Sequence, residues 1–235
     1  MKRLSINEAE LLAQKFRSEA GMNLTEPINV KTLLRKFCIF TMYRPLSESS
    51  YGISVKTSDA KFMMVNSNST RGRQHFTIAH EIFHLFYDEH PEPHICSDSI
   101  TGVEKDANLF ASALLMPREG LLKQISETEM RSHSVSIATL IRLEQLYGVS
   151  RMSLLLRLKS IGLISELTLQ QLKQIGAKES ARAYGYDTSL YEKGNEGVVI
   201  GDFGEKARRL FEEGRISEGH YVELLNMIQD GSKKD

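Results

Sequence analysis

The chain has 235 residues, enough for one large domain or two small ones with a real hydrophobic core. Its 30 basic and 30 acidic residues balance, so no net charge draws it to nucleic acid or to a membrane surface. It has no membrane-spanning apolar run, no signal-peptide core, and only two cysteines, Cys38 and Cys96. These features exclude a disulfide framework and predict a globular cytoplasmic protein.

The N-terminal part is expected to form two helices followed by a small antiparallel sheet. Ser5 and Glu8 make a capping box, and apolar residues at helical spacing follow until Gly21 ends the first helix. A second, shorter helix comes next. Three strand candidates, separated by turn-forming residues, follow at 38–43, 51–55 and 61–66. An edge of such a sheet can bind an extended peptide as an added strand.

The stretch from Arg73 to Asp88, RQHFTIAHEIFHLFYD, carries His80, Glu81 and His84 in the pattern HExxH. Residues four apart share a helix face, so His80 and His84 can hold one metal ion, and Glu81 can take a proton from a water on it. Zinc suits the site, because imidazole is a good zinc ligand and a catalytic zinc keeps one position open for water. The rest of the helix is apolar and therefore buried. The alternative is a pair of hydrogen-bonded core histidines without a metal.

A catalytic zinc needs a third protein ligand, and two candidates follow. His90 stands at the third-histidine position of the pattern HExxHxxGxxH, but Tyr87 replaces the glycine that lets the chain turn there. Glu104 lies on a predicted helix that ends at Pro117. Helical spacing places Glu104 on the same face as small and apolar residues and places Asp106 on the opposite face. A carboxylate on such a face is costly unless paired or metal-bound, which favours Glu104. It could instead be a helix N-terminal carboxylate stabilised by the dipole.

From Glu104 to Pro117 the chain reads EKDANLFASALLMP, and this stretch follows FTIAHEIFHLF in that order. The pair of motifs resembles the ImmA/IrrE family of zinc metallopeptidases, and the resemblance covers roughly residues 25–165. It implies a Zn2+ site with His80, His84 and Glu104 as ligands and Glu81 as general base. It also implies the substrate class, because family members cleave helix-turn-helix repressors of mobile elements, prophages or stress regulons.

The segment between the two motifs, residues 89–103, is expected to be a loop with His90 and His94 in solvent. Cys96 lies in this segment. Its thiolate could occupy the open zinc position, but an ordinary loop cysteine is the favoured interpretation.

Three residues are candidates to stabilise the oxyanion of the tetrahedral intermediate: Tyr87, His75 and His133. Tyr87 is preferred because it shares the helix face of the HExxH histidines. Arg73 lies on the same face, two turns earlier, and could support the site from outside the ligand set.

The segment Ser136–Ser165 has the shape of a helix-turn-helix, with Gly148 in the turn. Its four basic residues against one acidic residue give a charge of +3, which is too small to argue for strong phosphate binding. The start of its second helix, Arg151 to Ser153, also offers few polar base readers. We therefore favour a helical hairpin packed on the peptidase over a DNA-binding element.

The rest of the chain is expected to be helical. A helix at 166–176 precedes a mixed, mobile stretch at 178–197, and a helical hairpin follows. The predicted fold is thus α+β. A mostly helical zincin-like domain with its small antiparallel sheet occupies residues 1–130, a helix-turn-helix-like segment 131–165, and a helical extension 166–235.

The expected function is that of a zinc-dependent endopeptidase that cuts a regulatory protein, a helix-turn-helix repressor by the family resemblance, with no membrane partner. The alternative is a non-catalytic zinc-containing regulator that binds DNA or a protein through its C-terminal helices. The complete HExxH pattern argues against the alternative, because a structural zinc site does not need Glu81.

Overall fold

The computed structural model describes residues 3–88, 93–97 and 102–229. Helices α1 (Ile6–Glu19) and α2 (Val30–Lys36) precede the first three strands. The capping box of α1 is present: Ser5 Oγ accepts from the Glu8 amide at 3.2 Å, and the Glu8 carboxylate accepts from the Ser5 amide at 2.8 Å. Gly21 follows α1 in a left-handed conformation with φ of +60°, as expected for a C-terminal glycine.

The central sheet has five strands in the order β4-β2-β3-β1-β5. Their bounds are β1 Ile39–Arg44, β2 Ser50–Lys56, β3 Lys61–Asn66, β4 His94–Ser97 and β5 Val199–Ile200. The three expected strands are confirmed, and so is the α+β class. The expectation of a purely antiparallel sheet is wrong, because β1 pairs with β3 in parallel. Strand β2 forms a hairpin on the other side of β3, so β1 meets β3 running in the same direction.

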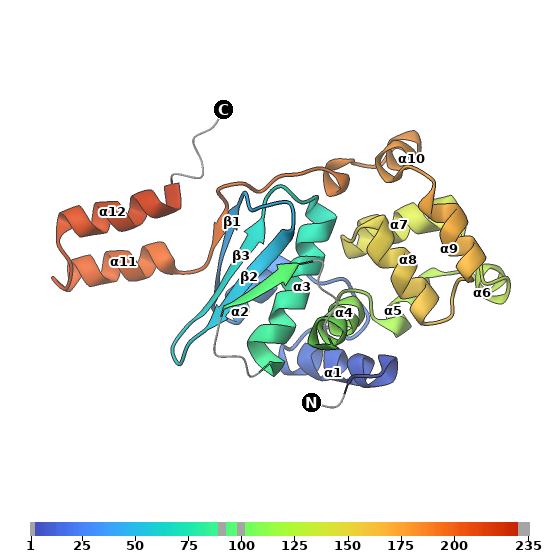
Figure 1. Cartoon of the computed structure of the whole chain (residues 1–235), viewed down its shortest axis with the longest axis horizontal. Coiled ribbons are helices and arrows are strands. Elements are labelled where there is room, and N and C mark those ends of the chain that lie inside the picture. The colour runs from blue at the N-terminus through green and yellow to red at the C-terminus, as the bar shows by residue number, and fades with distance from the viewer. Residues whose placement is uncertain (1–2, 89–92, 98–101, 230–235) are drawn as a thin grey trace.

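Helix α3 (Arg71–Tyr87), which carries the HExxH pattern, lies between the sheet and α4 (Gly102–Leu115) (Figure 1). The contact with α4 uses small residues, because Ala107 and Ala111 are both fully buried and let the two helix backbones approach. Phe110 on α4 packs against Phe16 on α1 with ring centroids 5.8 Å apart. The HExxH helix is therefore held on two sides, and its polar residues are removed from water.

The helix-turn-helix-like segment is packed against the peptidase. Two short helices, α5 (Arg118–Gln124) and α6 (Glu127–Arg131), lead to α7 (Ile137–Tyr147) and α8 (Arg151–Ser160). Arg157 Nε donates to the Met116 carbonyl at 3.0 Å, and the guanidinium also pairs with Glu10 on α1. Both arginines of α8 are less than a tenth exposed. Both side chains therefore bond to groups inside the protein and are not available to bind the phosphates of DNA.

The C-terminal stretch corrects one expectation. Helices α9 (Glu166–Lys173) and α10 (Ala177–Ala183) are followed by a 3-10 turn, η1 (Ser189–Tyr191). The segment expected to be mobile bonds to the start of α3: the Arg71 amide donates to the Glu192 carbonyl at 2.9 Å, and Gln74 Nε2 donates to the Gly194 carbonyl at 2.9 Å. Local sequence could not show these contacts, because their partners lie more than a hundred residues away.

After η1 the chain adds β5 to β1 and then forms a hairpin of α11 (Phe203–Glu212) and α12 (Glu218–Gln229), which stands apart from the helical side of the molecule (Figure 1). The predicted hairpin is confirmed. The three-part division of the chain stays a prediction, although β5 ties the last part to the sheet of the first. Among the described residues, no helix combines the length and apolar character needed to cross a membrane.

We expect Arg151→Ala to lower the free energy of unfolding by about 3–5 kcal/mol, because it strands a buried carboxylate. Glu144 is fully buried, and Arg151 Nε donates to its Oε1 at 2.6 Å. Urea unfolding followed by circular dichroism measures the change. Lys159→Ala on the same helix is the control, because its exposed pair with Glu166 should contribute less than ~1 kcal/mol. Equal effects of the two substitutions would contradict the structural role of Arg151.

Candidate metal centre

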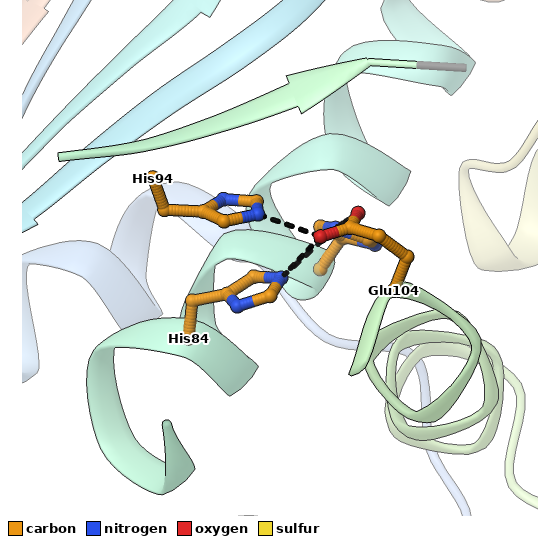
Figure 2. Close-up of side chains that lie close together, drawn as sticks. His84, His94 and Glu104 are labelled. Carbon is orange, nitrogen blue, oxygen red and sulfur yellow. Dashed lines mark hydrogen bonds and ion pairs between the residues drawn. The ribbon is translucent and has the colours of Figure 1, made fainter. Parts of the chain in front are cut away.

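The two HExxH histidines and Glu104 meet where α3 crosses α4. His80 and His84 project from the same face of α3, and Glu104 comes from the first turn of α4. His80 Nε2 lies 3.1 Å from Glu104 Oε2 and 3.2 Å from His84 Nε2. His84 Nε2 is 3.7 Å from Glu104 Oε1 (Figure 2). The structure thus brings together the three residues that the sequence predicts as ligands.

These distances fit a metal ion. Zinc bonds to nitrogen and oxygen are about 2.0–2.1 Å long, so two ligand atoms of a tetrahedral site lie about 3.3 Å apart. The three separations above scatter around that value. Two imidazole nitrogens that face each other at 3.2 Å inside a protein also need a cation or a shared proton between them. The donor set of two nitrogens and a carboxylate is one that zinc accepts.

Each of the two histidines is oriented by a hydrogen bond on its other ring nitrogen. His80 Nδ1 donates to Asn108 Oδ1 at 3.0 Å, and His84 Nδ1 donates to Asp88 Oδ2 at 2.9 Å. Because the acceptors are an amide oxygen and a carboxylate, each Nδ1 carries a proton, and a neutral ring then offers the lone pair of Nε2 to a metal. This arrangement is typical of metal-ligating histidines.

Glu81 lies beside this donor set and is fully buried. Its Oε2 accepts from Ser54 Oγ at 2.5 Å, whereas its Oε1 has no hydrogen-bond partner within the described part of the chain. Gly52 on β2 makes this possible: a Cβ there would lie 2.6 Å from Thr77 Cγ2 and 3.3 Å from Glu81 Oε1. One carboxylate oxygen is anchored and the other remains for a water or a substrate, which is what a general base requires.

The charges of the site call for a cation. Burial would raise the pKa of Glu104, but hydrogen bonds from His80 and His94 outweigh it and hold that pKa well below its usual value. Burial would lower the pKa of His94, yet its bonds to Glu104 and Glu81 raise it to about 9. Burial lowers the pKa of His84, which favours the neutral, metal-binding form. The carboxylates therefore bind positive charge, which a metal ion would also supply.

His94 is the site residue that sequence reasoning missed. It was expected in solvent within a loop, but it lies on β4, whose pairing with β2 sets it opposite Ser54. Its Nε2 is 2.7 Å from Glu104 Oε1, and its Nδ1 is 3.1 Å from Glu81 Oε2. A four-residue strand carries no usable periodicity, so no signal in the sequence could have found it. Cys96 is buried on the same strand, with its thiol within 4.8 Å of donor atoms of His80 and Glu81.

Other candidates lie elsewhere. Tyr87 packs in the aromatic core against Phe110, with ring centroids 5.4 Å apart, rather than beside the donor set. The second and third oxyanion candidates bond to backbone carbonyls: His75 Nδ1 to Gly148 at 2.7 Å and His133 Nδ1 to Gly162 at 2.8 Å. These positions do not support the predicted oxyanion role for any of the three.

The remaining sequence candidates fall outside the ligand set. Asp106 accepts from the Leu4 amide at 3.0 Å, away from the ligands as expected. The guanidinium of Arg73 stacks on the Tyr51 ring at 3.6 Å. His90 lies outside the described residues.

An HExxH helix beneath a small mixed sheet, with a carboxylate from the next helix beside its two histidines, defines a metallopeptidase. The sequence matches the family model of peptidase M78, the IrrE N-terminal-like domain, over residues 34–159. This chain therefore belongs to that family, which confirms the resemblance found in its motifs. A comparison with curated proteins finds no match. Membership makes the chain a peptidase with a protein substrate, and the His and Glu group gives it a potential metal site.

We expect Glu104→Ala to reduce bound metal from about one ion per chain to well below that value, because the substitution removes the carboxylate that faces both HExxH histidines. Metal content of the purified protein, measured by plasma mass spectrometry, tests this. Asp106→Asn is the matched control, because Asp106 is an equally buried carboxylate on the same helix, each of the two being 8% exposed. Full metal content in Glu104→Ala would show that the ligand assignment is wrong.

Proposed function

We propose that this chain is a zinc-dependent endopeptidase that hydrolyses one peptide bond in a regulatory protein. His80, His84 and Glu104 are its zinc ligands, and Glu81 is its general base. The observation that carries the proposal is the convergence of these four side chains from two helices. The ligand atoms stand 3.1–3.7 Å apart, next to a buried carboxylate with one unbonded oxygen.

A zinc ion held by these ligands supplies Lewis acidity for the peptide carbonyl and lowers the pKa of water to about 7. Glu81 takes the proton of the attacking water on Oε1, which has no hydrogen-bond partner among the described residues, and delivers it to the leaving nitrogen. Ser54 holds the other oxygen, so the carboxylate keeps its direction while the proton moves. Burial of the site strengthens each of these electrostatic interactions.

A groove beside the centre has the size and character for side chains of a protein substrate. Its volume is about 730 Å³, and it runs between α3, α4 and α8. Asn108 stands in its wall and also bonds His80, so the groove begins one side chain away from the ligands. Its apolar lining residues are Phe76, Leu109, Met152 and Leu156.

The substrate we propose is a helix-turn-helix transcriptional repressor of a mobile element or stress regulon, with cleavage in the cytoplasm. The family resemblance supports this substrate class. The alternative is a zinc-containing regulator that binds DNA or a partner through its C-terminal helices. It loses support from α8, because Arg151 and Arg157 are buried in ion pairs and Leu156 lines the groove.

We expect Glu81→Gln to keep its metal and lose cleavage by at least about a hundredfold, because general-base catalysis contributes that much or more. The experiment is a substrate trap: tagged Glu81→Gln and wild-type proteins are expressed in the native cell, and bound proteins are identified by mass spectrometry. An intact repressor on the variant, found cleaved with wild type, supports the proposal. The purified repressor must then be cut by wild type alone.

The same experiment can also contradict the proposal. If both forms bind metal and retain the same uncut partners, or DNA, the centre is not catalytic and the binding function takes precedence. Glu81→Asp is a useful companion, because it keeps the charge and shortens the reach by one methylene.

A further inference from the structure

His94 occupies the same metal centre as the predicted ligands, but it comes from the sheet. Its ring stacks on the ring of His84, with centroids 3.5 Å apart and an interplanar angle of 16°. Figure 2 shows both imidazoles directed at the carboxylate of Glu104, one from β4 and one from α3. The shorter of the two contacts belongs to His94, at 2.7 Å. It therefore reaches the same carboxylate as His84 does, although its side chain is 16% exposed against 3% for His84.

The three imidazoles are hydrogen-bonded in the same way. Each uses Nδ1 to donate to a side-chain oxygen and turns Nε2 toward Glu104. For His94 the acceptor is Glu81 Oε2, at 3.1 Å. A carboxylate on one ring nitrogen and a metal on the other is the usual setting of a ligating histidine. His94 thus has the hydrogen-bond partner on Nδ1 that a metal ligand would have.

We propose that His94 is a fourth protein ligand, which closes the metal site in the resting enzyme. The donor atoms of His80, His84, His94 and Glu104 all lie within 4.8 Å of one another. Four such atoms complete a tetrahedral zinc site, and closed sites of this kind are structural or resting, whereas a catalytic site keeps one position open. This inference rests on the proposed function, and it makes the resting form latent.

The same residue also bonds to the proposed general base. Glu81 Oε2 accepts from His94 as well as from Ser54, so this oxygen orients the ligand while Oε1 remains for a water. Strand β4 further covers the edge of the sheet, because it pairs with β2 from Ser50 to Ser54. An extended substrate would need that edge to add itself as a strand. Departure of β4 would therefore open a metal position and uncover the edge of β2 in one movement, so β4 takes the place of a substrate strand in the resting form.

X-ray absorption at the zinc edge tests the coordination directly, without any activity. We expect about three imidazoles per zinc in the wild-type holoenzyme and about two in His94→Ala, with the missing ligand replaced by a solvent oxygen. His133→Ala is the control, because His133 is exposed and bonded to Gly162 far from the ligands in sequence. His94→Gln, which keeps a polar side chain of similar reach, replaces His94→Ala if the alanine protein does not fold.

A second readout is the binding of acetohydroxamate, which needs open zinc positions. If the open form is populated at about one tenth or less, wild type binds the hydroxamate at least about tenfold more weakly than His94→Ala. Two imidazoles in the wild-type spectrum, or equal hydroxamate affinities, would overturn the inference and leave the zinc site itself intact. A loss of cleavage in His94→Ala with only two imidazoles in wild type would assign His94 to catalysis instead. A wild-type protein without zinc would overturn the proposed function as well.

Discussion

The arrangement of the metal centre depends on two buried carboxylates, Glu81 and Glu104. Both are less than a tenth exposed, and one imidazole, His94, touches them both. Removing two negative charges from water is costly unless positive charge and hydrogen bonds replace the solvent. Three histidines replace the solvent around Glu104, and the Nε2 atom of each faces its carboxylate. A cation in this position would complete the arrangement, so a metal bound as we propose would stabilise the fold as well as take part in the reaction.

The scaffold around the site is built by close backbone approach. Ala107 and Ala111 let α4 lie against α3, and Gly52 leaves room beside Glu81. At the start of α3, a Cβ on Gly72 would lie 2.8 Å from the Ser150 amide, so the turn into α8 is packed directly on the HExxH helix. The segment with the shape of a DNA-binding motif is thereby fixed to the peptidase, and its two buried arginines pair with Glu144 on α7 and Glu10 on α1. Shape alone does not make a helix-turn-helix a reader of DNA.

Glu81 bonds to the proposed fourth ligand through one oxygen, and its other oxygen is free of hydrogen bonds among the described residues. Its Oε2 accepts from His94 and Ser54, and its Oε1 remains for a water, while His94 closes the metal position beside it. A peptidase that acts on a specific regulator benefits from such an arrangement, because a closed metal site and a covered sheet edge protect other proteins from cleavage. The energy for opening would come from the substrate, whose own strand hydrogen bonds replace those of β4.

The sequence by itself determined the HExxH helix, the helix of Glu104, the first three strands and the packed character of the helix-turn-helix-like segment. Each follows from periodicity, capping or residue chemistry within a window of some twenty residues. The parallel pairing of β1 with β3, the place of His94 on β4, and the bonds from residues 189–195 to the start of α3 came only from the tertiary structure. These depend on contacts between distant segments, and strand pairing leaves no local pattern that names the partner. A short strand with one histidine looks like a loop until the sheet beside it is known.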